Sequence, residues 1–342
     1  MKAYVLNKIG DLSYENVPVP ELREDWALIK VKAAGICSSD IPRIYKRGTY
    51  HFPTIPGHEF AGDVVEVSGE KYTDIVGKRV SVFPLIPCGK CNQCKKKMYE
   101  MCENYDYIGS RRNGAFAEYV EVPVWNLIEL GADISYESAA LMEPLSVALH
   151  AIRKADISKN NSIAIIGTGT IAIAISQILN VLGYSQVAII ARNNKKKSLI
   201  SRFENVEYII ENQSHSELFD IVFECVGSEE AIEQSLKYAE TGAQIILVGN
   251  PYGNINLPQN LYWKILRKQL TVKGTWNSTY DGKNESDWTV VRNMLQNNQI
   301  NTTDMITHKY HQTDMIKALN VMKNHKELYC KVMTFWNEDN YE

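Results

Sequence analysis

The glycine-rich segment at residues 167–172 limits the fold of this chain more than any other feature. It follows residues 162–166, whose sequence Ser-Ile-Ala-Ile-Ile predicts a buried strand, and it opens residues 170–182, which have the pattern of a helix. Its sequence, Gly-Thr-Gly-Thr-Ile-Ala, matches the G-x-G-x-x-G/A fingerprint, whose glycines let the backbone approach a pyrophosphate at a helix N-terminus. The segment therefore predicts a dinucleotide-binding strand–helix unit. The predicted cofactor contacts in this loop are Gly167, Thr168, Gly169, Thr170 and Ile171.

Strand and helix signals alternate along the region that follows. Strands are predicted at 187–190, 206–210, 220–225, 244–248 and 270–273, and helices at 195–203, 229–240 and 259–268. This alternation is typical of a parallel, doubly wound sheet. The first part of the chain instead has short β signals between Gly and Pro turns, which favours an antiparallel barrel or sandwich. A last predicted strand at 328–335 could return to this first domain.

Composition excludes several classes of function. The 342 residues suggest two domains, and 37 basic against 40 acidic residues give a formal net charge of −3. We therefore expect no nucleic-acid partner and no basic patch for a membrane. The N-terminus lacks an apolar signal core, and polar residues interrupt the most apolar stretch, 163–182, so no membrane span is expected. The seven cysteines, an odd and tightly clustered set, indicate reduced thiols and a cytoplasmic protein.

Four of the cysteines have the spacing of a metal site. They occur as Cys88-x2-Cys91-x2-Cys94-x7-Cys102. Four thiolates so close in sequence can surround one tetrahedral Zn²⁺ and leave no position for water or substrate, which is typical of a structural zinc. Disulfides and an iron–sulfur cluster are the alternatives; the expected compartment argues against the first, and the late fourth cysteine against the second.

A second set of possible ligands is spread along the chain. Cys37, His58, Glu59 and Glu143 offer S, N and O donors, which together suit a Zn²⁺ with an open or exchangeable position. Each is a weak signal alone, because a single cysteine is usually a small core residue. Glu143 carries more weight because it follows the apolar run at 139–142, so it is predicted to be buried, and a metal would be a sufficient partner for a buried carboxylate.

The end of the second predicted strand of the nucleotide-binding region bears on cofactor choice. An NAD-selective site places an acidic residue there to bind the ribose 2′-hydroxyl, but this chain has Ala191 followed by Arg192. Arg192 and Lys195 are placed to bind a 2′-phosphate, so NADP(H) is favoured over NAD(H). The alternative is that the basic residues are a solvated start of a helix.

The four-cysteine motif, the dispersed set of zinc ligands and the glycine-rich loop together resemble those of the zinc-dependent medium-chain alcohol and polyol dehydrogenases. The resemblance covers essentially the whole chain. The resemblance implies an α/β fold with a GroES-like, β-rich catalytic domain and a Rossmann domain with a doubly wound parallel sheet. The catalytic domain would comprise residues 1–146 and 277–342, with a structural zinc lobe at 84–105, and the Rossmann domain residues 147–276. Active sites of this kind lie in the cleft between the two domains. Two Zn²⁺ per chain and a homodimer or homotetramer are also implied.

The resemblance also assigns roles to residues. Cys37, His58, Glu59 and Glu143 match the catalytic-zinc positions, and the four cysteines match the structural lobe. Ser39 matches the hydroxyl that takes the substrate proton, although Pro42 stands where many of these enzymes have a relay histidine. Three further positions, Val226, Gly227 and Val248, match residues that line the cofactor.

A narrower resemblance concerns the substrate. The segments at 42–45, 84–88, 108–114 and 264–268 are similar to those of the branch that acts on polyol phosphates such as galactitol 1-phosphate. A phosphorylated substrate requires arginines, and Arg43 and Arg111 are candidates, with Trp276 also expected near the substrate. The implied reaction is the reversible oxidation of a secondary alcohol of a polyol or polyol phosphate to a ketose, with hydride transfer to NAD(P)⁺. The alternatives are an L-threonine, sorbitol or diol dehydrogenase, or a non-catalytic zinc- and nucleotide-binding protein.

Overall fold

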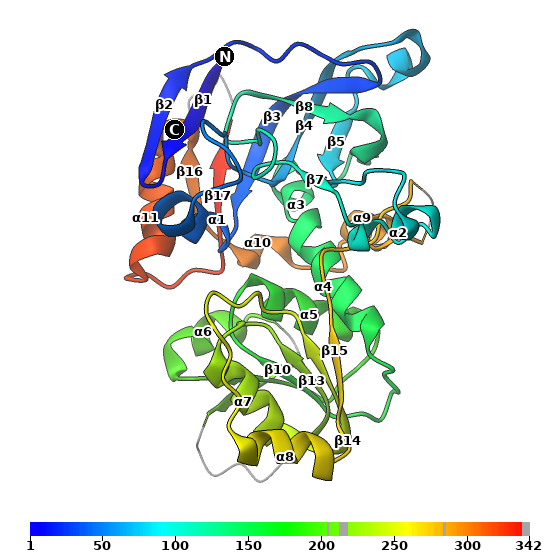
Figure 1. Ribbon diagram of the computed structural model, residues 1–342, viewed down its shortest axis with the longest axis vertical. Helices are drawn as coiled ribbons and strands as arrows, with labels where there is room; N and C mark the ends of the chain where they lie inside the picture. The colour runs from blue at the N-terminus through cyan, green and yellow to red at the C-terminus, as the bar shows by residue number, and fades with distance from the viewer. Residues whose placement is uncertain (204, 212–217, 283–284, 337–342) are drawn as a thin grey trace. The chain divides into compact units, whose positions relative to one another are not determined.

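The computed structural model describes residues 1–203, 205–211, 218–282 and 285–336, and the chain divides into two units (Figure 1). Unit 1 comprises Met1–Glu143, Thr279–Asn298 and Met305–Glu342, and unit 2 comprises Pro144–Ser278 and Gln299–Asp304. The short return segment belongs to unit 2 because its Asn301 donates a backbone N–H to Oε1 of the Gln177 side chain at 2.8 Å. Within the described residues, no helix combines the length and apolar character needed to cross a membrane.

Unit 1 is built on a seven-stranded sheet in which antiparallel pairing predominates. Six strands follow the order β16-β17-β3-β4-β5-β9, and β8 also pairs with β3. The strands are β3 (Trp26–Ile36), β4 (Glu59–Val67), β5 (Arg79–Val82), β8 (Tyr119–Pro123), β9 (Leu127–Glu129), β16 (Ile306–His311) and β17 (Lys331–Phe335). The predicted return of the last strand is confirmed, because β17 pairs antiparallel with β3; Figure 1 shows the red strand beside the blue one.

Smaller elements complete unit 1. Its remaining strands form two ladders, β1 (Lys2–Lys8) with β2 (Asp11–Asn16) and β6 (Leu85–Ile86) with β7 (Asp106–Tyr107). Its helices are α1 (Asp40–Pro42), α2 (Asn92–Lys95), α3 (Tyr136–Ala140), α9 (Asp287–Gln296) and α11 (Met315–Asn324). Short π or 3₁₀ segments are η1 (Arg43–Arg47), η2 (Glu70–Ile75), η3 (Tyr99–Met101), η4 (Val124–Asn126) and η6 (Gln312–Asp314). Buried side chains of β1, β3, β4, β8 and α11 make one apolar core, so the last helix is held by the first strands.

Unit 2 contains a six-stranded sheet whose pairs are all parallel. The strand order is β12-β11-β10-β13-β14-β15, so the order reverses direction beside β10. The strands are β10 (Ile163–Ile166), β11 (Val187–Ala191), β12 (Glu207–Ile210), β13 (Phe219–Glu224), β14 (Ala239–Leu247) and β15 (Thr271–Gly274). Parallel sheets of this kind bind ligands at the carboxyl ends of the strands on either side of such a reversal, and the glycine-rich loop follows β10. The predicted doubly wound sheet is confirmed.

The helices of unit 2 lie mostly where the sequence predicts them. They are α5 (Thr170–Val181), η5 (Asn194–Lys196), α6 (Lys197–Ile200), α7 (Glu229–Tyr238) and α8 (Gln259–Arg267). The chain enters the unit through α4 (Met142–Lys154), and α10 (Thr302–Met305) lies at its return. The helix predicted over 195–203 is shorter, because a 3₁₀ turn capped by the Asn193 side chain precedes a single turn of α-helix.

Candidate active site

Three of the predicted zinc ligands converge in unit 1. One donor atom each from Cys37, His58 and Glu59 lies within 4.8 Å of the others. The register of the sheet explains this, because Gly35 near the end of β3 pairs with Glu59 at the start of β4, which places Cys37 beside His58. Soft sulfur, imidazole and carboxylate in one group are a donor set that suits Zn²⁺. The Nδ1 atom of His58 is buried without a hydrogen-bond partner among the described residues, and Asp40 Oδ1 lies 3.6 Å from it.

A buried aspartate organises two of these ligands. Asp40 is completely buried and accepts the backbone N–H of Cys37 at 3.0 Å and a guanidinium N–H of Arg43 at 2.6 Å. Burial alone would raise the pKa of Asp40, but His58 and Arg43 outweigh it and lower that pKa. Burial in turn opposes the charge of His58, yet Asp40 and Cys37 raise the pKa of His58 well above its usual value. Asp40 therefore fixes the backbone of Cys37 by a hydrogen bond and places a negative charge beside His58.

A buried ion pair holds the third donor, Glu59. Lys331 of β17 is 2% exposed, and its Nζ donates to Glu59 Oε2 at 2.5 Å and to the Ile36 carbonyl at 3.3 Å. The carboxylate fits because residue 35 is glycine; a Cβ there would lie 2.4 Å from Glu59 Oε2. Glu59 is thus already paired with a cation, which leaves its other oxygen for a metal or water.

Glu143 lies next to this group, in the first turn of α4. It is 8% exposed, as predicted from the apolar run before it, and its Oε1 accepts a hydrogen bond from the Tyr107 hydroxyl at 3.2 Å. The Glu143 oxygens do not meet the 4.8 Å distance that joins the other three donors, but the charges of His58 and Glu59 act on this carboxyl. Burial raises the pKa of Glu143 to about 7.

The four remaining predicted ligands form a separate cluster in the lobe between β6 and β7. The Sγ atoms of Cys88, Cys91, Cys94 and Cys102 lie within 4.8 Å of one another. None of the seven cysteines, all of which the structure describes, forms a disulfide. The backbone N–H groups of Cys88 and Cys94 point to sulfurs of Cys102 and Cys91 at 3.2 and 3.5 Å. Four mutually close thiols with N–H groups directed at sulfur fit one closed tetrathiolate metal site.

Glycines allow the backbone to pack tightly beside His58. Gly57 has φ +98°, and a Cβ at Gly109 or Gly114 would lie 2.4 or 2.1 Å from the Gly57 carbonyl oxygen. The loop that carries Arg111 therefore lies directly against the backbone that leads to the metal ligands.

In unit 2 the glycine-rich loop has the expected shape. Gly167 has φ +115°, and a Cβ on it would lie 2.8 Å from a Val226 methyl group. Gly169 is the N-cap of α5, and no atom lies within 4 Å of where its Cβ would be, so there is open space in front of the helix N-terminus. The carbonyl of Thr168 accepts a hydrogen bond from Lys196 Nζ at 3.1 Å. A helix N-terminus with this space is suited to a phosphate group.

The predicted cofactor positions after β13 and β14 are joined by one buried residue, Glu224, through its carboxylate and its backbone carbonyl. Glu224 is 1% exposed, and its Oε1 accepts the N–H groups of Val226 and Gly227 at 2.7 and 2.8 Å. Its carbonyl accepts the N–H groups of Val248 and Gly249 at 2.8 and 3.0 Å. Burial raises the pKa of Glu224, although the N–H groups of Gly227, Val226 and Gly249 oppose the shift. Val226, with 43% of its surface exposed, is presented by this turn.

The basic residues after β11 differ in whether their side chains contact the glycine-rich loop. Arg192 and Lys195 are exposed, and the Asn193 side chain caps the Lys195 N–H. Lys196, one of the lysines that follow Arg192, donates to the Thr168 carbonyl of the glycine-rich loop.

The candidate proton acceptor and substrate residues are placed as follows. Ser39 is half-buried at the N-cap of α1, two residues after Cys37. Arg43 is paired with Asp40, the residue that also accepts the Cys37 backbone N–H. Arg111 lies between the rings of Tyr50 and Tyr105, with its guanidinium carbon 4.4 and 4.3 Å from their centroids. Trp276, in unit 2, is 50% exposed.

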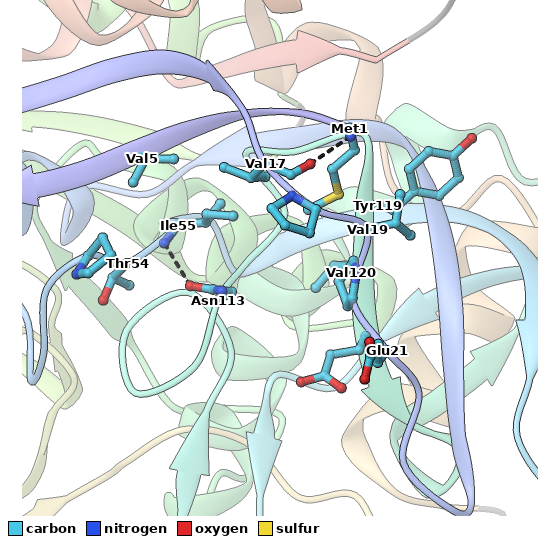
Figure 2. A pocket seen from close by; sticks show the side chains of 14 residues that line it. Met1, Val5, Val17, Val19, Glu21, Thr54, Ile55, Asn113, Tyr119 and Val120 are labelled. Carbon is cyan, nitrogen blue, oxygen red and sulfur yellow. Dashed lines mark hydrogen bonds between the residues drawn. The ribbon is translucent and has the colours of Figure 1, made fainter.

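A cavity of about 450 Å³ in unit 1 is separate from all of these residues (Figure 2). Figure 2 shows that valine and isoleucine side chains, the Asn113–Ile55 hydrogen bond and Glu21 surround it. None of the residues that line it is a predicted ligand, cofactor or substrate residue.

Three residues around the candidate metal centre were not predicted from the sequence. They are Asp40, Tyr107 and Lys331. A lysine within the apolar strand 328–335 was a usable signal for Lys331, because a buried lysine requires a partner. Nothing in the local sequence marks Tyr107, whose role depends on a contact with a residue 36 positions later.

Comparisons with known proteins give the family and the fold of this chain. Residues 23–132 match the family described as alcohol dehydrogenase GroES-like domain, and residues 167–296 match zinc-binding dehydrogenase. Galactitol 1-phosphate 5-dehydrogenase of Escherichia coli (strain K12) is 33% identical over 321 residues, which cover 90% of this chain and 92% of that protein. L-threonine 3-dehydrogenase of Legionella pneumophila (strain Corby) is 32% identical over 323 residues, 90% of this chain and 92% of that protein. The crystal structure of galactitol-1-phosphate dehydrogenase from Escherichia coli superposes with a TM-score of 0.90 and 30% identity, covering 98% of this chain and all of that one.

Proposed function

This chain belongs to the zinc-binding, medium-chain alcohol and polyol dehydrogenase family, and on that premise we propose that it oxidises a secondary alcohol of a polyol phosphate to a ketose. It is an NAD(P)-linked oxidoreductase that uses a small-molecule substrate. The observation that carries the finer proposal is the convergence of Cys37, His58 and Glu59 in a chain 33% identical to a galactitol 1-phosphate 5-dehydrogenase.

The proposed catalytic metal is a Zn²⁺ held by Cys37 and His58 with Glu59 and Glu143 as exchangeable ligands, and a second Zn²⁺ would occupy the four-cysteine lobe. Bound there, zinc would act as a Lewis acid toward the substrate hydroxyl and make it more acidic. Asp40 keeps Cys37 and His58 in place, and Lys331 holds the Glu59 carboxylate. Ser39 would accept the hydroxyl proton, and the hydride would pass to the nicotinamide ring. Because residue 42 is proline, the proton leaves Ser39 without a histidine at that position.

We propose NADP(H) as the preferred cofactor, with Arg192 and Lys195 at the ribose 2′-phosphate. Both side chains are exposed after the end of β11, and residue 191, the last of that strand, is alanine where an acid would favour NAD(H). Replacing Arg192 by alanine should raise the KM for NADP⁺ about tenfold and leave that for NAD⁺ within about twofold. A higher kcat/KM with NAD⁺ than with NADP⁺ in the unmodified enzyme would contradict the proposal.

For the substrate phosphate we propose contacts with Arg43 and Arg111, with Trp276 beside the substrate. Arg111 is the stronger candidate, because the Tyr50 and Tyr105 rings hold its guanidinium rigidly, whereas the Arg43 guanidinium is paired with Asp40. A fixed guanidinium binds phosphate with little loss of side-chain entropy.

The test is a spectrophotometric screen of free and phosphorylated polyols, with NAD⁺ and NADP⁺ in parallel. We expect a phosphorylated polyol to give the highest kcat/KM and Arg111→Met to lower it about tenfold or more without affecting free polyols. Equal rates on free and phosphorylated substrates would refute the phosphate proposal. L-threonine belongs in the same screen, since an L-threonine 3-dehydrogenase is 32% identical to this chain.

We also propose a homodimer or homotetramer in the cytoplasm. The edge strand β15 exposes Val272 at 42%, and the neighbouring helix α8 exposes Trp263 and Leu266 at 43% and 56%. An uncovered edge strand with apolar neighbours favours pairing with a second copy. Light scattering that gives the mass of a single chain at micromolar concentration would contradict this. Seven free thiols support a reducing compartment.

A further inference from the structure

Tyr107 joins the two candidate metal sites of unit 1. It is the last residue of β7, which directly follows the four-cysteine lobe, and it pairs with Leu85 of β6, which directly precedes that lobe. The β6–β7 ladder therefore closes the base of the lobe. The Tyr107 carbonyl also accepts backbone N–H groups from Ser110, Arg111 and Arg112 at 3.3, 2.9 and 3.1 Å. Its main chain is thus fixed on both sides, by the lobe and by the loop that follows.

The side chain of Tyr107 points from this base to the other metal centre. Its hydroxyl donates to Glu143 Oε1 at 3.2 Å, and its ring centroid lies 5.7 Å from that of His58 at an interplanar angle of 60°. A tyrosine used only for packing would leave a buried hydroxyl in need of a partner, which costs free energy. Here the partner is the carboxylate that we propose as an exchangeable zinc ligand.

We propose that Tyr107 is a positioning residue of the reaction, which holds the Glu143 carboxylate at a place set by the base of the four-cysteine lobe. This inference rests on the proposed function, because it assigns Glu143 to the catalytic centre. With Oε1 engaged by the hydroxyl, Oε2 is the oxygen left for the metal or for the substrate. Partners of this kind, which orient a ligand without touching the metal, control both affinity and rate.

The test is a set of single hydroxyl deletions in the holoenzyme and in enzyme whose catalytic metal is replaced by Co²⁺. Tyr107→Phe removes the hydrogen bond and keeps the ring against His58. Tyr280→Phe is the matched control, since it removes another buried tyrosine hydroxyl, one that donates to the Leu127 carbonyl at 3.0 Å and has no part in the proposed site. We expect Tyr107→Phe to change the visible Co²⁺ spectrum and lower kcat about tenfold, with the KM for the cofactor within about twofold of the wild-type value. Tyr280→Phe should reproduce the wild-type spectrum and rate.

A second arm tests whether Tyr107 acts through Glu143. In a Glu143→Gln background, adding Tyr107→Phe should change the spectrum and kcat little further, whereas equal effects in both backgrounds would overturn the proposal. A Tyr107→Phe enzyme with the wild-type spectrum and kcat would overturn it as well. If the unmodified chain binds no Co²⁺ outside the lobe or lacks dehydrogenase activity, the proposed function itself fails, and the wild-type arm alone reveals this.

Discussion

The two candidate metal clusters of unit 1 differ in how the chain brings their donor atoms together. In the lobe all four donors come from one stretch, 88–102, and the turns of that stretch bring the sulfurs together. The second cluster draws Cys37, His58 and Glu59 from the facing ends of β3 and β4, and Glu143 lies beside it in a helix far along the chain. Two buried charged residues hold its donors: Asp40 accepts the Cys37 backbone N–H, and Lys331 donates to the Glu59 carboxylate. We infer that the lobe depends on its metal for structure, whereas the fold itself organises the second cluster.

The largest expected effect separates chemistry from folding. Cys37→Ser removes the sulfur donor of the second cluster, and we expect kcat to fall at least about 10³-fold because the Lewis acid is lost or weakened. Cofactor binding and Tm should stay near wild-type values, since Asp40, Lys331 and the sheet remain in place. Steady-state kinetics, fluorescence titration with NADPH and calorimetry check these three quantities. A Cys37→Ser enzyme with wild-type kcat would remove the cluster from catalysis.

The buried ion pair behind Glu59 predicts a large change in stability. Lys331→Met leaves the Glu59 carboxylate buried without its cation, which should lower the free energy of unfolding by about 3–5 kcal/mol. Adding Glu59→Gln removes the unpaired charge and should restore most of that loss, because the penalty comes from a buried charge and not from lost packing. Urea unfolding of the two variants measures the difference. Equal stabilities of the single and double variants would show that Lys331 acts by packing alone.

A matched cysteine substitution in the lobe should lower stability, whereas Cys37→Ser should lower activity. Cys94 is 4% exposed, and Cys94→Ser should release the lobe metal and lower Tm by about 5–10 °C, because binding of such a metal contributes directly to folding. Metal analysis should show the loss of one zinc per chain while the Cys37 centre still binds Co²⁺. If Cys94→Ser kept both Tm and metal content, the structural assignment of the lobe would be wrong.

The same contrast explains what could be predicted from sequence. The lobe could be predicted because its donors are close in sequence. The parallel sheet could be predicted because each strand–helix unit is local. Cys37, His58 and Glu59 could be grouped by resemblance, but their supports could not, since Lys331 meets Glu59 only after 272 residues of chain. Arg43 shows the limit most clearly. Its position six residues after Cys37 predicts a phosphate contact, but no local pattern predicts that the completely buried Asp40 also binds its guanidinium.

The smallest effect concerns protons, and it tests whether Glu143 belongs to the second cluster. Burial raises the pKa of Glu143 from 4.5 to about 7, so in the metal-free folded protein this carboxyl keeps its proton between those values. That proton stabilises the metal-free fold below pH 4.5, and the stabilisation is lost as pH rises through about 7. A metal that binds Glu143 must displace the proton, so affinity should weaken as pH falls below 7.

The comparison that isolates this proton is a Co²⁺ titration of wild type and Glu143→Gln between pH 5 and 7. The slope of log Kd against pH should be smaller by about one unit in the variant, because one displaced proton contributes tenfold per pH unit. The lobe provides an internal control, because its four cysteines do not include Glu143. The pH dependence of Co²⁺ binding to the lobe should therefore be the same in both proteins. Identical slopes at the Cys37 centre would place Glu143 outside the ligand set and leave Cys37, His58 and Glu59 as its protein donors.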